Sequence, residues 1–207
     1  MANVNRAKGL SPIMNGDGSP WNQQATLYSV ATDAANTYAI GDIVMLAAGS
    51  DADGIPLVTK WAGAVTAGAL PVGVIVGIRV ADPSISLVGT NLNLNQVYLP
   101  VNSGAHYLYV VDDPSCIFEL QGDVTVWAAA NASNNASVTL TANQTGLGQA
   151  SPYSSTVATA PATTNTLPFQ ILGLVQRADN AYGSYAALRV RFNVHNQYGA
   201  LTGRTGV

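Results

Sequence analysis

The side chains that could carry out acid–base chemistry are few and are spread along the chain. Glu119 is the only glutamate, and it stands between Phe118 and Leu120, where strand alternation places it on the outward face. A glycosidase-type pair would need Glu119 and one of the ten aspartates, because such enzymes use two carboxyl groups. Nearly every aspartate sits in a turn-forming context, which favours a structural role. The sequence therefore predicts no catalytic carboxylate pair.

The histidines and the cysteine form no metal-binding or nucleophile pattern. His106 and His195 are the only histidines, and their spacing does not match a zinc motif. Cys116 is the only cysteine, and no neighbour in the sequence would lower its pKa. The segment 51–54, Asp-Ala-Asp-Gly, lacks the further ligands of a calcium loop, so we expect a hairpin turn there. These observations predict a protein that is not an enzyme and has no catalytic, metal-binding or cofactor-binding residues.

The composition favours a surface that other protein chains cover. Hydrophobic residues make up 48% of the chain and charged residues only 9%, whereas an ordinary soluble domain carries about 25% charged residues. Charge is depleted at the centre of protein interfaces, although a small surface of Asn, Ser, Thr and Gln would also fit. The net charge of −3 argues against a nucleic-acid partner. The apolar run 70–80 is broken by Pro and Gly and is shorter than the about 20 residues of a membrane span.

Strand-like segments separated by turn residues predict an all-β fold. The segment 188–195 alternates apolar and polar side chains, as a half-buried strand does. The segment 169–176 is almost continuously apolar, as in a strand buried on both faces. No helical stripe is visible, so we expect an antiparallel β-sandwich of jelly-roll type. The remaining predicted strands are 25–30, 42–48, 56–61, 71–81, 96–99, 105–111 and 115–121.

The chain divides into an arm, a β-domain and a tail. Residues 1–24 predict an extended N-terminal arm, residues 25–195 the β-sandwich domain, and residues 196–207 a C-terminal tail. Deleting residues 2–20 should then leave the β-domain folded. Residues 128–166 form a long uncharged excursion, which is either a flexible loop or a projection ordered by contact with neighbours.

Apolar side chains in the arm and charged side chains near the C-terminus are the candidate interface residues. The apolar residues of the arm could pack on the chain's own body or on a neighbour. Positive charges in the arm and on the last predicted strand could complement acidic surfaces between subunits. The predicted protein-interface residues are Arg6, Leu10, Ile13, Met14, Trp21, Arg189, Arg191 and His195.

Several stretches are similar to the decoration, or cement, proteins of tailed-bacteriophage heads. The most similar is 167–177, Leu-Pro-Phe-Gln-Ile-Leu-Gly-Leu-Val-Gln-Arg, followed by Asp-Asn at 179–180. Other matching stretches are 9–12, 18–22, 38–44, 51–56, 110–114 and 118–121, so the resemblance covers most of the chain except 128–166. It implies a structural virion protein on the outer capsid surface. Such a protein would bind the major capsid protein and copies of itself, as a homodimer or homotrimer, and would have no direct nucleic-acid or membrane partner.

A tail-fibre or other surface-adhesion module is the alternative function. Such a module would share the low charge and the strand-rich pattern. It would also expose aromatic platforms for a sugar or a receptor, with Trp61, Trp127, Tyr153 and Tyr182 as candidates.

Overall fold

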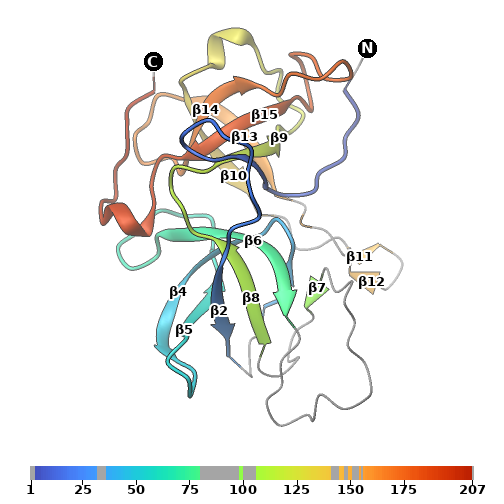
Figure 1. Ribbon diagram of the computed structural model, residues 1–207. Helices are drawn as coiled ribbons and strands as arrows, with labels where there is room; N and C mark the ends of the chain where they lie inside the picture. The colour runs from blue at the N-terminus through green and yellow to red at the C-terminus, as the bar shows by residue number, and fades with distance from the viewer. Residues whose placement is uncertain are drawn as a thin grey trace.

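The protein is almost entirely β-structure, as predicted. The computed structural model describes residues 3–31, 36–79, 98–99, 106–140, 145–146, 149–150, 154 and 156–206, and structural statements below refer to these residues. Two short 3₁₀ helices, η1 (Ala129–Asn131) and η2 (Asn196–Tyr198), are the only helical elements there. The strands form two main bodies, a closed barrel and a six-stranded antiparallel sheet, which pack together (Figure 1). The prediction of an all-β fold built from packed antiparallel sheets is confirmed.

Five strands close into the barrel in the lower half of Figure 1. Adjacent strands of the barrel pair antiparallel, with one exception. The strands β2 (Thr26–Val30) and β5 (Pro56–Lys60) meet through one parallel pair, Ser29 with Leu57. The interior is filled by apolar side chains, among them Val44, Ile75 and Leu108. In order around the barrel the strands are β2 (Thr26–Val30), β5 (Pro56–Lys60), β4 (Ile43–Ser50), β6 (Pro71–Arg79) and β8 (His106–Val111). A small sheet of β3 (Tyr38–Ala39) and β7 (Tyr98–Leu99) accompanies them.

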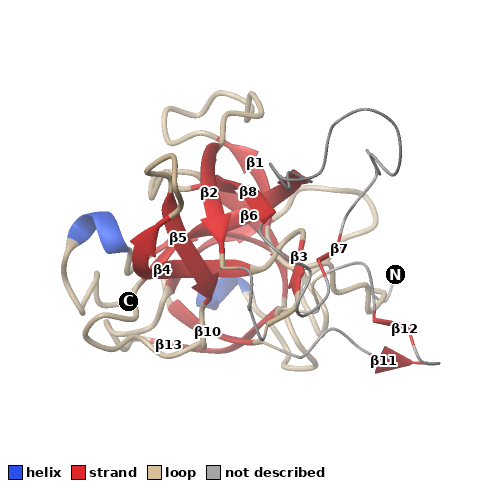
Figure 2. Cartoon of the chain, turned by 90° about the horizontal axis from the view of Figure 1, so that it is seen from below, coloured by secondary structure: helices blue, strands red, loops and turns tan. Residues whose placement is uncertain are grey.

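The six-stranded sheet curls so that β13 (Val157–Ala162), at one edge, approaches the end of β9 (Ile117–Gln121), whereas the other edge strand, β1 (Ser11–Met14), lies apart from β13 in Figure 2. A parallel bridge joins Gly122, just after β9, to Ala158 in β13, and the Asp123 amide donates to the Ala158 carbonyl at 2.9 Å. The outer edge of β13 is therefore partly paired rather than open. The strand order is β1 (Ser11–Met14), β9 (Ile117–Gln121), β15 (Ala187–Phe192), β14 (Phe169–Leu174), β10 (Asn135–Thr139) and β13 (Val157–Ala162). A separate hairpin joins β11 (Thr145–Gly146) to β12 (Gln149–Ala150).

One apolar core joins the two bodies. The inward faces of β9, β14 and β15 contribute Phe118, Phe169 and Phe192, and the ring of Phe192 lies 5.6 Å from Phe118 and 4.8 Å from Phe169 between centroids. Barrel strands and the residue after β5 add their own side chains to the same cluster, including Val74 and Trp61. The sheet and the barrel therefore share buried surface and fold as one unit.

The N-terminal arm is part of this unit, which corrects the expectation that it could be removed. Leu10 is 1% exposed and belongs to the shared core, and β1 pairs with β9 through Ser11 opposite Glu119. Before β1, the Leu10 amide donates to the Gly41 carbonyl at 3.0 Å. Gly9 and Gly41 both have positive φ and lie so close that a Cβ on either would collide with the other's backbone region. Deleting residues 2–20 would remove an edge strand and a core side chain.

The uncharged excursion also contributes to the sheet. Strands β10 and β13 both come from it, and Asn135 in β10 bonds to other segments of the chain. Asn135 Nδ2 donates to the carbonyls of Thr164 and Arg204, at 3.0 and 2.6 Å. The tail is fixed to the same segment by the Gly206 amide, which donates to Thr163. Leu140 packs against the shared core; Leu147 and Tyr153 lie outside the described residues.

We expect Leu10→Ala to lower the free energy of unfolding by about 2–5 kcal/mol, since it leaves a cavity in the shared core. Urea denaturation of the variant and the wild type would measure this difference. Val4→Ala is the matched control, because Val4 is exposed in the same arm. A Leu10→Ala variant as stable as the control would contradict the assignment of the arm to the core.

Candidate binding surface

The outward face of β9, β15 and β14 carries a row of paired polar side chains. Glu119 stands opposite Arg189, and Arg191 stands opposite Gln170, so their side chains share one face of the sheet. Phe118, Leu120, Leu188 and Val190 alternate with them and point into the core. Arg191 donates through Nε and Nη2 to Gln170 Oε1, at 3.0 and 2.7 Å. Arg189 and Arg191 are thus half-buried, with their guanidinium groups lying over the sheet.

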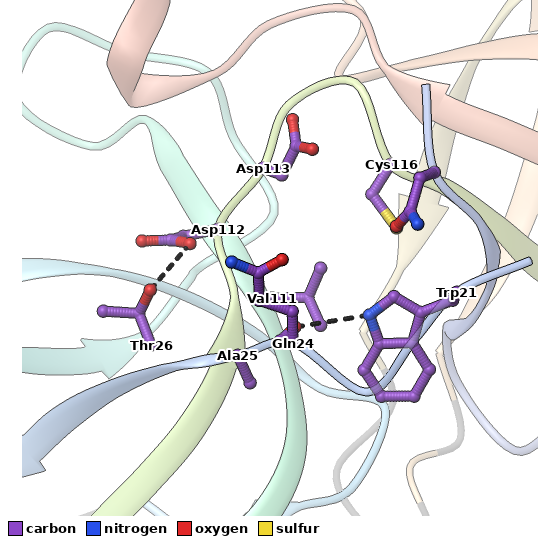
Figure 3. A pocket seen from close by; sticks show the side chains of 9 residues that line it. Trp21, Gln24, Ala25, Thr26, Val111, Asp112, Asp113 and Cys116 are labelled. Carbon is purple, nitrogen blue, oxygen red and sulfur yellow. Dashed lines mark hydrogen bonds between the residues drawn. The ribbon is translucent and has the colours of Figure 1, made fainter. Parts of the chain in front are cut away.

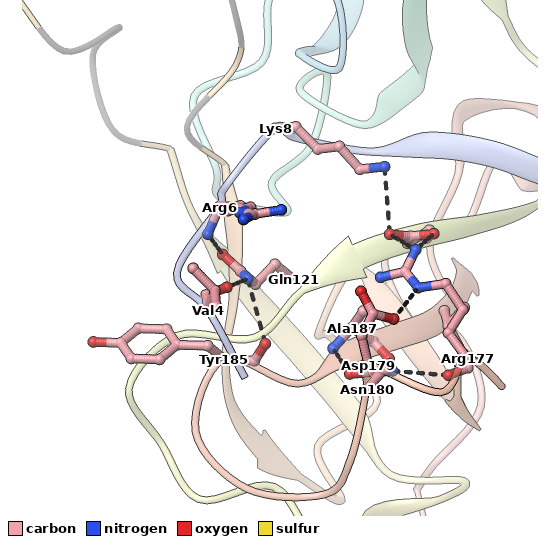
Figure 4. Close-up of polar contacts among 11 residues, drawn as sticks. Val4, Arg6, Lys8, Gln121, Arg177, Asp179, Asn180, Tyr185 and Ala187 are labelled. Carbon is pink, nitrogen blue, oxygen red and sulfur yellow. Dashed lines mark hydrogen bonds and ion pairs between the residues drawn. The ribbon is translucent and has the colours of Figure 1, made fainter. Parts of the chain in front are cut away.

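Glu119 forms ion pairs with Lys8 and Arg177, the two cations labelled beside it in Figure 4. Arg177 Nη1 lies 2.8 and 2.9 Å from its two carboxylate oxygens, and Lys8 Nζ lies 3.3 Å from Oε1. Arg177 also pairs through Nε with Asp179 at 3.4 Å. These cations cover Glu119, which is only 7% exposed although it lies on the outward face as predicted. A nearly buried carboxylate requires such partners, because desolvation of an unpaired charge is costly.

A groove of about 500 Å³ lies beside this network and between the arm and the 177–187 segment. Gln121 anchors the arm along the groove, since its Oε1 accepts from the Arg6 amide at 3.0 Å and its Nε2 donates to the Val4 carbonyl at 2.9 Å (Figure 4). The guanidinium of Arg6 is exposed and makes no polar contact with any described residue. The side chains that line the groove are those of Asn3, Val4, Arg6, Lys8, Glu119, Gln121, Arg177, Asp179, Asn180, Tyr185 and Ala187.

Positive charge is concentrated on this side of the molecule. Of the eight lysines and arginines in the chain, five lie on the outward sheet face or along the groove, and among the described residues the acids that line the groove are Glu119 and Asp179. We call these five the basic face; they are Arg6, Lys8, Arg177, Arg189 and Arg191. Asp42, Asp51, Asp53, Asp112 and Asp113 lie on the barrel or in its turns. A chain of net charge −3 therefore presents a surface of the opposite sign.

Exposed apolar side chains adjoin the groove. Val4, Val124, Val126 and Tyr182, which we call the apolar rim, are 59%, 66%, 72% and 43% exposed. Hydrogen bonds hold together the three segments that carry them: Ser184 Oγ donates to the Val124 carbonyl at 2.7 Å, and Asn3 Nδ2 donates to the Ala181 and Ser184 carbonyls at 2.8 and 2.9 Å. Four of the large apolar side chains exposed on the described surface thus come from contacting segments at one end of the sheet.

A smaller cavity of about 140 Å³ lies between the 15–25 loop and the turn after β8 (Figure 3). Several of its polar groups have partners within the chain. Trp21 Nε1 donates to the Gln24 carbonyl at 3.3 Å, and Thr26 Oγ1 donates to Asp112 at 3.0 Å. Burial, reinforced by the charge of Asp113, raises the pKa of Cys116 to about 12, so its thiol stays protonated and unreactive at neutral pH. This cavity supports a structural role.

Two predicted interface residues lie inside the fold, which corrects their assignment. Leu10 is in the shared core, and His195 is fully buried, with its ring 5.0 Å from that of Phe192 between centroids. His195 Nε2 bonds to the Val72 carbonyl of the barrel strand β6, and Nδ1 accepts from the Gln197 amide at 3.1 Å. Asn193, predicted on the polar face, is also buried. Of the other candidates, Arg6 is exposed, while Ile13, Met14, Trp21, Arg189 and Arg191 are half-buried.

Four of the eight described aspartates accept from nearby backbone amides in turns, as predicted for them. Asp17, Asp51, Asp113 and Asp123 each accept from a backbone amide two residues later. Asp42 is different, because it is buried and pairs with Lys60 at 2.8 Å. Within the described ranges, no group of three or more His, Cys, Asp and Glu residues could hold a metal ion. In the same ranges, no helix is long and apolar enough to cross a membrane.

The sequence did not reveal the Arg177 network or the apolar rim. A lone glutamate inside an apolar strand was the available signal for a buried ion pair, but the partner is 58 residues away in the sequence. In the sequence, Val124 and Val126 alternate with Thr125 and Trp127, which indicates that the two valines share a face. The structure shows which face is buried: Trp127 lies in the core and the valines are exposed.

Comparisons with protein-family models, with curated proteins and with solved structures find no match to this chain.

His195 should make stability depend on pH. Burial lowers its pKa from the usual value of 6.5, against the opposing effects of the Val72 carbonyl and the charges of Asp112 and Asp113. The unfolded chain then binds a proton more readily than the folded one, so stability is present above pH 6.5 and is lost as the pH falls through the folded pKa. Urea denaturation between pH 8 and 5 would measure this loss. His195→Gln keeps a donor to Val72 and should flatten the dependence; an unchanged slope would contradict the assignment to His195.

Proposed function

We propose that this chain is a structural virion protein that binds the outside of an icosahedral phage head and cements neighbouring major capsid subunits. The resemblance of its motifs to phage decoration proteins supports the identity of the partner. The all-β fold, with arm and tail fixed to the body, is compatible with a module that must remain rigid on a shell under internal pressure.

The basic face is the observation that carries this proposal. Five of eight cations gather on one outward surface of a chain with net charge −3. Such a surface steers a protein towards an acidic partner and fixes its orientation more than it adds affinity. Each contact can be weak, because many identical copies on one shell add their contributions.

The contacts of Glu119 favour binding over catalysis. Both of its oxygens are engaged by Arg177, and Lys8 adds a second cation. An ion-paired carboxylate covered in this way serves to hold the arm and the 177–179 segment against the sheet. The groove beside it is lined by charges of both signs and by backbone-anchoring amides, as in a recognition surface.

The tail-fibre or adhesion alternative loses support because two of its aromatic candidates are buried. Trp61 and Trp127 are each 1% exposed and belong to the shared core, so neither can stack on a sugar. Tyr153 lies outside the described residues, and Tyr182 is the remaining exposed candidate. A single exposed tyrosine beside an apolar rim fits a protein partner at least as well as a glycan.

Binding to heads that lack this protein tests the proposal. The wild-type chain should sediment with purified heads of the phage that encodes it, with an affinity that falls as salt is raised. Arg189→Gln/Arg191→Gln should weaken binding about tenfold, since two charges of the basic face are lost. Arg79→Gln, which removes a cation from the barrel strand β6, is the matched control.

The melting temperatures of both variants should first be compared with that of the wild type, so that a folding defect is not mistaken for a binding defect. Heads saturated with the wild-type protein should also retain their DNA at higher temperature than bare heads. Wild-type protein that stays in the supernatant at low salt, or decorated heads no more stable than bare ones, would contradict the cement function.

A further inference from the structure

Val4 belongs to both the groove and the apolar rim, and hydrogen bonds within the chain link the segments that carry the two. Val4 and Asn3 line the groove, and Asn3 is bonded to the segment that carries Tyr182. The backbone of Gly183 exchanges hydrogen bonds with that of Trp127, at 2.9 and 3.3 Å, which places the 181–184 and 124–127 segments side by side. Because these links are within the chain, the surface needs no rearrangement before it binds, and little ordering entropy is lost.

The charges of the groove favour a carboxylate-bearing partner. Arg6, Lys8 and Arg177 face Glu119 and Asp179, which leaves an excess of one positive charge. Arg177 is engaged by Glu119 and Asp179, and Lys8 makes a single 3.3 Å contact with Glu119. The exposed guanidinium of Arg6 has no polar partner among the described residues, so its donors remain available for a carboxylate.

We propose that this surface binds an extended acidic segment of a shell subunit, with a carboxylate held by Arg6 and Lys8 in the groove and neighbouring apolar side chains on the apolar rim. This inference rests on the proposed function, because it names the partner chemistry of that binding. A volume of about 500 Å³ accommodates a few side chains but not a folded domain. The four rim residues supply the apolar contact area that an ion pair in a solvent-exposed groove lacks.

Fluorescence anisotropy with a labelled peptide in which Asp and Leu alternate tests the site directly. The wild-type chain should bind this peptide, and should bind the same sequence with Asn in place of Asp at least tenfold more weakly. Arg6→Gln should lower the affinity for the Asp peptide about tenfold, and Val124→Ser/Val126→Ser should lower it for both peptides. Leu46→Ser is the control, since Leu46 is exposed to a similar degree as Tyr182 but lies on the barrel strand β4.

Equal binding of the Asp and Asn peptides, or unchanged binding by Arg6→Gln, would overturn the proposal. A dimer in sedimentation velocity that Arg6→Gln dissociates would assign the groove to a second copy of the chain and would also overturn it. The head-sedimentation assay separates this inference from the proposed function. If the wild type and all groove and rim variants bind heads equally, the groove is not the contact but the cement function stands. If the wild type binds the peptide but not the heads, the cement function fails and the acidic-segment site remains.

Discussion

The shared apolar core is the constraint on which the rest of the structure depends. One cluster of buried side chains joins the barrel to the curled sheet. It combines Trp61 and Val74 from the barrel side, Phe118 and Phe192 from the sheet, and Leu10 from the arm. Burial of this surface is the main favourable term in folding. To bury Leu10 in this cluster, the arm must pass close to the barrel at Gly41. Gly9 and Gly41 approach each other there so closely that neither position has room for a Cβ.

The polar surface follows from how the core is built. Once Phe118 and Leu120 point inward, strand geometry turns Glu119 outward, under the returning arm and the 177–179 segment. A carboxylate covered by chain on that face must be neutralised, and Lys8 and Arg177 do so. The ion pairs that offset the desolvation cost of Glu119 also place Lys8 and Arg177 along the groove. Part of the basic face is therefore a consequence of burying Glu119.

Low overall charge and a basic face are the two surface properties on which the proposed binding to a shell depends. Few charges compete with apolar and hydrogen-bonding contacts over most of the molecule, while the clustered cations set the orientation of approach. The apolar rim then offers contact area that water-exposed ion pairs do not supply.

The sequence by itself determined the β-class, the approximate position of most strands and the turns made by Asp17, Asp51 and Asp113, because these depend on local alternation and on side chains that bond nearby amides. Only the tertiary structure decided that the barrel closes, that β10 and β13 join the sheet, that Leu10 and His195 are buried, and that Arg177 meets Glu119. The physical reason is that strand pairing and side-chain cover are non-local. Alternation in a sequence reports which side chains share a face, whereas the segment that later covers that face comes from elsewhere in the chain.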